Sequence, residues 1–339
     1  MHSIFWFRTR QWVLSRVLHL TEHKKQTLLA APDAVLLLPT LFRKRRISRI
    51  LLVTTPGFVR RGTLTSLLDG CKKENISVTI FSEIAPDPQI ESVEQGFRLY
   101  QQIQAQAILA IGGGSVLDAA KLIGARVCCP KKTVPAMRGL LKIRRKLPPL
   151  FAVPTTAGTG SEATAAAVLT DCIDGKPYKY AVNDLCLIPD TAVLDPRLTI
   201  SLPSSMTADT GMDALTHAME AFLNLFASRS VQNASIEQSA KISMPCPKPG
   251  VTAPVLPHGR KCFMHRIWPV SLLPTTLSAT SMPSLTPSVH CTTFRTEEPT
   301  RFCCLLFCAN TVPALRLNLP FSPMRFLSAE IPFLKRLSG

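Results

Sequence analysis

Short apolar segments that recur along the chain restrict its fold more than any other feature. They are residues 49–54 (RILLVT), 78–81 (VTIF), 107–111 (AILAI), 149–153 and 191–194 (TAVL). Helix-like stretches such as residues 93–104 separate several of them. Continuous apolar strands that alternate with helices are typical of a parallel sheet whose two faces are both covered. The sequence therefore predicts an α/β fold built on a parallel sheet.

The pattern becomes helical from about residue 205. Residues 209–224 carry no strand pattern, and residues 234–241 (ASIEQSAK) suit a second helix. We therefore expect residues 1–200 to form an α/β domain, and residues 201–243 to begin an all-helical domain.

The composition changes again near residue 243. Residues 244–339 hold 14 of the 28 prolines and six of the 11 cysteines, but only three acidic residues, Glu297, Glu298 and Glu330. Prolines at this density break both helices and central strands. The segment is nevertheless too apolar for an ordinary disordered tail. We predict that residues 244–339 are an aberrant, poorly structured tail and that the helical domain is incomplete.

The net charge of +17 would by itself favour nucleic acid or a membrane surface as a partner. Much of the imbalance, however, is a lack of acidic residues in the tail, without a basic face interleaved with aromatic residues. No apolar run reaches the ~20 residues of a membrane-spanning helix. Arg8, Arg10 and Arg16 interrupt the first 20 residues, which suit an amphipathic helix better than a signal peptide. The 11 cysteines are scattered and odd in number, which favours reduced thiols over a set of disulfides. We predict a cytoplasmic protein with no specific nucleic-acid partner and no membrane association.

Three consecutive glycines follow the third apolar segment. Gly112, Gly113 and Gly114 precede Ser115 and the helix-like residues 116–123 (VLDAAKLI). Bare glycine backbone lets N–H groups approach a phosphate closely, and a helix N-terminus adds unpaired donors. The same run also suits an ordinary tight turn, and it is not the G-x-G-x-x-G fingerprint. Taken alone, the glycine run is compatible both with a phosphate-binding site and with a plain turn.

Four motifs in order resemble the iron-containing (group III) alcohol dehydrogenase family. They are GGGSVLDAAK at 112–121, PTTAGTGSE at 154–162, LIPDTAVLDP at 187–196 and TGMDALTHAME at 210–220. The resemblance covers about residues 50–240. It implies a Rossmann-like nucleotide-binding domain, an all-helical metal-binding domain, and an active site in the cleft between them.

The resemblance also implies that the cofactor is NAD or NADP. It assigns cofactor contacts to Gly112, Gly113, Gly114, Ser115, Asp118, Thr155, Thr156, Thr159, Ser161 and Lys179.

One position departs from the family pattern. The family often has an aspartate after the first strand, where it bonds the adenosine ribose and favours NAD. Here residues 53–57 are VTTPG, and Thr55 stands where the aspartate would be, with no charge to repel a 2′-phosphate. Arg60 and Arg61 are close in sequence. We therefore predict that a cofactor site including Thr55 tolerates NADP.

Asp213 and His217 lie four residues apart in a helical stretch, so both project from one face. A carboxylate and an imidazole can share a first-row divalent ion, although such a pair alone is more often a surface contact. The resemblance of residues 211–220 to the family implies that they are two ligands of Fe2+, or of Zn2+. The ion would act as a Lewis acid on the alcohol oxygen.

The family supplies two more histidines from a later helix, and this chain lacks that string. His258, His265 and His290 stand in other contexts and receive no ligand role. When the codons of residues 279–305 are read from the third base of each, they permit YVHALAHSLGALYNIPHGRANAVLLP, with both histidines in the family context. We infer a frame switch between about residues 240 and 247, either a sequencing error or a lesion of the gene.

The resemblance therefore implies an oxidoreductase that transfers hydride between a primary alcohol or aldehyde and NAD(P). We expect this chain to be impaired because two metal ligands are missing. A small alcohol or aldehyde is the expected substrate, and a homodimer is expected if the C-terminal domain is intact. The alternatives are a non-catalytic nucleotide-binding remnant and an enzyme like glycerol dehydrogenase or dehydroquinate synthase.

Overall fold

The computed structural model describes residues 26–243, except for 86, 174–175, 201, 224–226 and 228. Two predictions lie outside the described residues: the amphipathic helix within the first 20 residues and the aberrant tail of residues 244–339. The same is true of His258, His265 and His290.

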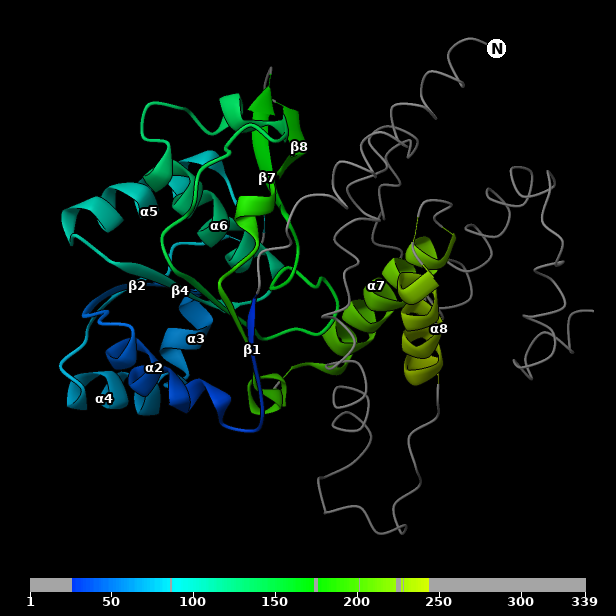
Figure 1. Ribbon diagram of the computed structural model, residues 1–339, viewed down its shortest axis with the longest axis horizontal. Coiled ribbons are helices and arrows are strands. Elements are labelled where there is room, and N and C mark those ends of the chain that lie inside the picture. The colour runs from blue at the N-terminus through cyan, green and yellow to red at the C-terminus, as the bar shows by residue number, and fades with distance from the viewer. Residues whose placement is uncertain are drawn as a thin grey trace, which may run out of the picture. The chain divides into compact units, whose positions relative to one another are not determined.

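A six-stranded sheet organises the described part of the chain (Figure 1). Its strand order is β1-β9-β6-β4-β2-β3, and every neighbouring pair is parallel. The strands are β1 (Thr27–Ala30), β2 (Arg49–Val53), β3 (Ser77–Phe81), β4 (Ala107–Gly112), β6 (Leu150–Pro154) and β9 (Thr191–Leu194). The five apolar segments correspond to β2, β3, β4, β6 and β9, so the predicted parallel α/β fold is confirmed. The edge strand β1 was not predicted.

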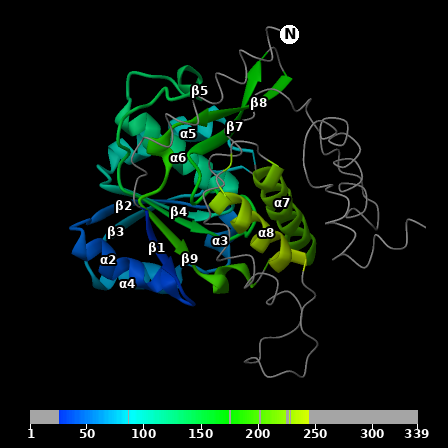
Figure 2. The same ribbon diagram turned by 45° about the vertical axis from the view of Figure 1, so that its right-hand side comes forward.

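Helices cover both faces of this sheet (Figures 1 and 2). They are α2 (Leu38–Lys44), α3 (Pro56–Arg60), α4 (Thr65–Lys73), α5 (Ile90–Gln102) and α6 (Gly114–Cys128). Alternate residues of β4 enter different cores, because successive side chains of a strand point to opposite faces. Leu109 packs in a cluster with Phe42 of α2 and Leu67 of α4, whereas Ile108 packs in a cluster with Val93 of α5.

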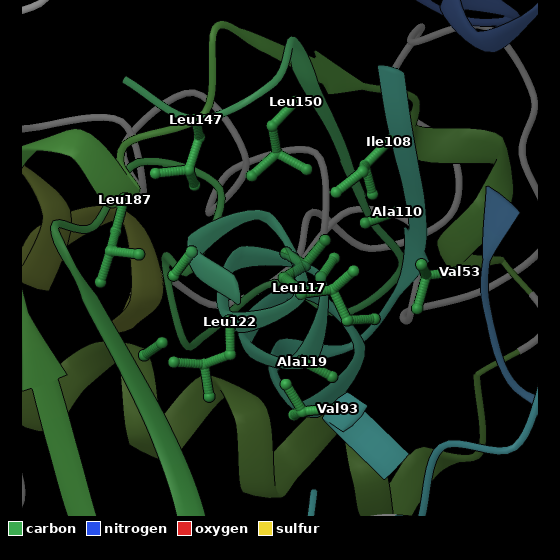
Figure 3. Close-up of a cluster of buried hydrophobic side chains, with 14 of the residues drawn as sticks. Val53, Val93, Ile108, Ala110, Leu117, Ala119, Leu122, Leu147, Leu150 and Leu187 are labelled. Atoms are coloured by element: carbon green, nitrogen blue, oxygen red, sulfur yellow. The ribbon is translucent and has the colours of Figure 1, made fainter. Parts of the chain in front are cut away.

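Helix α6 is the centre of the second cluster (Figure 3). Leu117 and Leu122 of this helix are almost fully buried. Helix α5 approaches α6 closely at Gly96, where a Cβ atom would lie only 2.4 Å from Cδ1 of Ile123. The helix that begins at the glycine run is thus fixed by packing along its length.

A three-stranded sheet lies against α6 and was not predicted. It consists of β5 (Gly139–Leu140), β8 (Lys176–Asn183) and β7 (Ala166–Ile173), in that order. Strands β7 and β8 form an antiparallel pair, and β5 is parallel to β8. Asp184, which follows β8, is buried and accepts hydrogen bonds from the backbone N–H groups of Ile143 and Arg144, both at 2.9 Å. That carboxylate holds the loop after β5 against the end of β8.

Helices α7 (Ser204–Leu223) and α8 (Arg229–Ser243) pack side by side after the sheet (Figures 1 and 2). They contain residues 209–223 of the first predicted helical stretch and all of the second, residues 234–241. Single turns complete the described elements: η1 (Ala34–Leu37), η2 (Pro135–Met137), η3 (Leu185–Leu187) and η4 (Pro196–Thr199). Within the described ranges, none of the helices combines the length and the apolar character needed to cross a membrane.

Candidate functional site

The glycine run lies at the carboxyl edge of the central sheet. Strand β4 ends at Gly112, and helix α6 begins at Gly114. On one side the Oγ1 of Thr54, just after β2, donates a 2.8 Å hydrogen bond to the carbonyl of Ile111. On the other side the N–H of Thr155, just after β6, donates a 2.9 Å bond to the carbonyl of Gly112. Open α/β sheets bind ligands at this edge, outside the carboxyl ends of the strands.

The segment after β6 packs directly on the glycine turn, Gly112 to Gly114. We call this segment, residues 155–165, the threonine loop. A Cβ on Gly113 would lie 3.5 Å from Oγ1 of Thr156. A Cβ on Gly114 would lie 2.9 Å from Cγ2 of Thr159, which is closer than real Cβ atoms approach other atoms. The two predicted cofactor loops therefore meet, and glycine is required at Gly114 for them to do so.

Asp118 and Ser161, both predicted cofactor contacts, bind each other. The Oγ of Ser161 donates to Oδ1 of Asp118, and the N–H of Val168 donates to Oδ2 at 3.0 Å. Burial raises the pKa of Asp118. The positive charge of Lys121 and the hydrogen bonds from Ser161 and Val168 act in the opposite direction and lower it. Both carboxylate oxygens of Asp118 thus have protein partners. Ser115 is half-buried in the first turn of α6.

Thr55 lies at the same sheet edge, at the N-cap of α3. Its backbone is extended, its side chain makes no capping hydrogen bond, and it is half-buried. Arg61 folds back along α3, with its guanidinium carbon 4.8 Å from the centroid of the Phe58 ring. A Cβ on Gly57 would lie 3.4 Å from Nη1 of Arg61 and 4.0 Å from Oγ1 of Thr55. A positive charge therefore lies close to Thr55.

Lys179 lies on β8 of the three-stranded sheet. Its Nζ is 2.6 Å from Oδ1 of Asp87, and both side chains are 61% exposed. Its expected place near the cofactor stays a prediction.

Asp213 and His217 project from one face of α7, as their spacing predicts. Oδ1 of Asp213 lies 3.5 Å from Nε2 of His217, and the side chains are 43% and 34% exposed, respectively. Partial burial raises the pKa of Asp213, and His217 opposes the shift. Across the described ranges, no group of three or more His, Cys, Asp or Glu side chains could hold a metal ion. The role of the pair as metal ligands stays a prediction.

The threonine loop also contacts α7. A Cβ on Gly158 would lie 2.4 Å from the carbonyl oxygen of Thr210, which is less than one helical turn before Asp213. Ala157 packs with Leu194 of β9 and Ala214 of α7 in a small buried cluster. The loop thus connects the glycine turn to the helix that carries Asp213.

Sequence reasoning missed Thr54, whose buried hydroxyl joins β2 to β4 beside the glycine turn. The only local signal was its place as the last residue of a predicted strand.

Replacing Gly114 with alanine should disrupt the contact between the two loops. The new Cβ would collide with Cγ2 of Thr159, so we expect dinucleotide affinity to fall by about tenfold or more, equivalent to at least ~1.4 kcal/mol. Titration of cofactor fluorescence measures this affinity. Adding Thr159→Ser removes Cγ2 and keeps the hydroxyl, so the double variant should recover part of the loss. Equal affinity in Gly114→Ala and the parent chain would contradict this close packing.

The sequence profile of the family described as "Iron-containing alcohol dehydrogenase" matches residues 26–196, just over half of the chain. The chain is 36% identical over 183 residues to a choline dehydrogenase of Bacillus subtilis, a match that covers 53% of this chain and 45% of that protein. It is 38% identical over 199 residues to a 1-propanol dehydrogenase of Salmonella typhimurium, covering 59% and 50%. A crystal structure of 1,3-propanediol oxidoreductase superposes with a TM-score of 0.64 at 27% identity, covering 75% of this chain and 64% of the other.

The chain thus spans about half the length of the curated relatives it matches. With the parallel sheet and the paired loops at its edge, this match shows that the chain belongs to the iron-containing alcohol dehydrogenase family.

Proposed function

We propose that the described residues form the cofactor-binding half of a metal-dependent oxidoreductase that transfers hydride between a primary alcohol or aldehyde and NAD or NADP. The observation that carries the proposal is the contact between the glycine turn and the threonine loop at the carboxyl edge of the sheet. Membership of the family and likeness to alcohol dehydrogenases support it.

In this proposal the cofactor diphosphate binds at the N-terminus of α6. Gly113 and Gly114 have no side chains, so the backbone N–H groups of the first turn can approach the phosphate oxygens. The positive end of the helix dipole favours the negative charge there. The hydroxyl groups of Thr156 and Thr159 lie on the same turn and suit phosphate or ribose oxygens as donors. The bound dinucleotide supplies the hydride chemistry.

Asp213 and His217 fit two ligand positions of Fe2+ or Zn2+, because a carboxylate and an imidazole on adjacent turns suit such ions. When bound, the ion would supply Lewis acidity toward the alcohol oxygen. The contact of Gly158 with Thr210 would set the distance from the cofactor loop to the α7 ligands.

A small primary alcohol or an aldehyde is the proposed substrate, and the cytoplasm is the proposed location. A homodimer is proposed for the form with a complete helical domain. The domain bounds 1–200 and 201–243 remain part of this proposal.

We also propose that residues 244–339 are the product of a frame switch near residues 240–247. The support is the shifted reading of residues 279–305, which restores a string with two family histidines. A second candidate function follows for the chain as written, namely dinucleotide binding without turnover. The observation that favours it is that the sequence lacks the later string that supplies two histidines in the family.

Thr55→Asp should shift cofactor preference from NADPH toward NADH. A carboxylate beside Arg61 would repel the 2′-phosphate and offer the ribose hydroxyls an acceptor, so we expect the ratio of the two dissociation constants to change by about tenfold or more, equivalent to at least ~1.4 kcal/mol. Calorimetric titration of both cofactors measures this ratio. Thr133→Asp adds the same charge beyond the far end of α6 and should leave the ratio unchanged. A parent chain that already strongly prefers NADH would contradict NADP tolerance.

Restoring the frame near the codons of residues 240–247 should create a metal-binding dehydrogenase. We expect the repaired chain to retain iron through dialysis and to oxidise primary alcohols, because it regains two histidine ligands. The chain as written should bind dinucleotide and show no turnover. Metal analysis and cofactor absorbance measure the two properties, with Asp213→Ala in the repaired chain as the control that loses both. Full activity of the chain as written, with tail peptides found by mass spectrometry, would refute the frame switch.

A further inference from the structure

Lys121 points into the protein, although it belongs to the glycine-rich motif. It lies on the second turn of α6 and has no exposed surface. Its Nζ donates hydrogen bonds to the carbonyl of Thr164 at 3.0 Å, to Oγ1 of Thr164 at 2.8 Å and to the carbonyl of Ala166 at 2.7 Å. An ammonium group has three N–H donors, so these acceptors use all of them. Lys121 has no donor left for a cofactor phosphate.

Asp118 makes the matching contacts on the same face of α6, three residues earlier. Its carboxylate accepts hydrogen bonds from Oγ of Ser161 and from the N–H of Val168, and Oδ1 lies 3.8 Å from Nζ of Lys121. The two side chains therefore hold the threonine loop and the start of β7 at alternating points, at Ser161, at Thr164 and Ala166, and at Val168.

The charge of Lys121 is retained at an energetic cost. Burial lowers the pKa of Lys121 to about 8, whereas the carboxylates of Asp118 and Glu162 favour the charged form. Removing one member of a buried ion pair usually destabilises its surroundings, because the other charge stays buried without a partner. An apolar side chain would avoid this cost, but it could not bind the loop carbonyls.

We propose that Asp118 and Lys121 are positioning residues that hold the threonine loop in the conformation in which Thr156 and Thr159 lie on the glycine turn. They act through the loop and do not touch the cofactor. The consequence for cofactor affinity rests on the proposed function, whereas the consequence for the loop itself does not.

Hydrogen exchange of the full chain without cofactor tests the loop directly. We expect amide protection in residues 155–165 to fall about tenfold, equivalent to ~1.4 kcal/mol, in Lys121→Met and Asp118→Leu, while β4 keeps its protection. Compared with Asp118→Leu, Asp118→Asn should retain most of the amide protection, because a rotated amide can accept a hydrogen bond from Val168 and donate one to Ser161. The matched control is Lys142→Met, which removes an exposed lysine.

Two milder variants apply even if the buried substitutions prevent folding. Ser161→Ala and Thr164→Val each delete one hydroxyl contact on the loop side and leave α6 unchanged. Both should reduce protection of the loop. Unchanged protection in both would overturn the proposal.

The pH dependence supplies a second readout. When the loop detaches, the pKa of Lys121 rises from about 8 toward 10.5, so the detached state binds more protons between these values. Raising the pH through that window therefore favours the attached loop. We expect protection factors of the loop to rise with pH in the parent chain and to stay level in Lys121→Met. A fall with pH in the parent chain would contradict the lowered pKa of Lys121 in the attached loop.

Cofactor titration separates this proposal from the proposed function. If the parent chain binds NADH or NADPH, Lys121→Met should weaken binding about tenfold, equivalent to ~1.4 kcal/mol, and Lys142→Met should not. If the parent chain binds neither, the cofactor function fails, and the exchange experiment still decides whether the two residues position the loop.

Discussion

The absence of a side chain at Gly114 is the constraint on which the site depends. It lets the threonine loop lie against the first turn of α6, where a single methyl group on Gly114 would collide with Thr159. Gly158 likewise allows a close contact on the other side of the loop, because a Cβ there would collide with the carbonyl oxygen of Thr210. Two close backbone approaches thus join three elements that are distant in sequence, namely α6, the loop after β6 and α7. A cofactor and a metal ion can share one reaction only if such elements are held together.

The central sheet could be predicted because its strands are buried on both faces. Each strand then consists of a continuous apolar run, as in residues 107–111, which is visible without knowledge of its neighbours. The edge strand β1 has four residues and, among the described strands, pairs only with β9, so neither its length nor its pattern distinguishes it from a loop. Strands β7 and β8 were missed for another reason. Val168 and Tyr178 are among their exposed residues, and such mixed strands resemble polar loops in sequence.

The same distinction applies to the site. The glycine turn, the threonine loop and the α7 pair could be predicted from local motifs and from their resemblance to a family. Their mutual contacts could not, because each depends on packing between segments far apart in the chain. Lys121 shows the difference most clearly. A lysine after a glycine-rich turn suggests a phosphate ligand, yet its position on the buried face of α6 directs it to Thr164 and Ala166. Asp118, predicted as a cofactor contact, likewise uses both oxygens within the protein.

The pairing of β1 with β9 has a consequence for the order in which the chain folds. Thr27 pairs with Thr191, so residues 28–190 form the loop that this pairing closes. Strand pairs this distant in sequence form late, because loop closure costs entropy before their contacts are gained. During synthesis, β1 leaves the ribosome long before its partner exists. β1 then has no partner strand, whereas β2, β3 and β4, which are closer together in sequence, can pair first. The β1 edge should therefore be the last part of the central sheet to form.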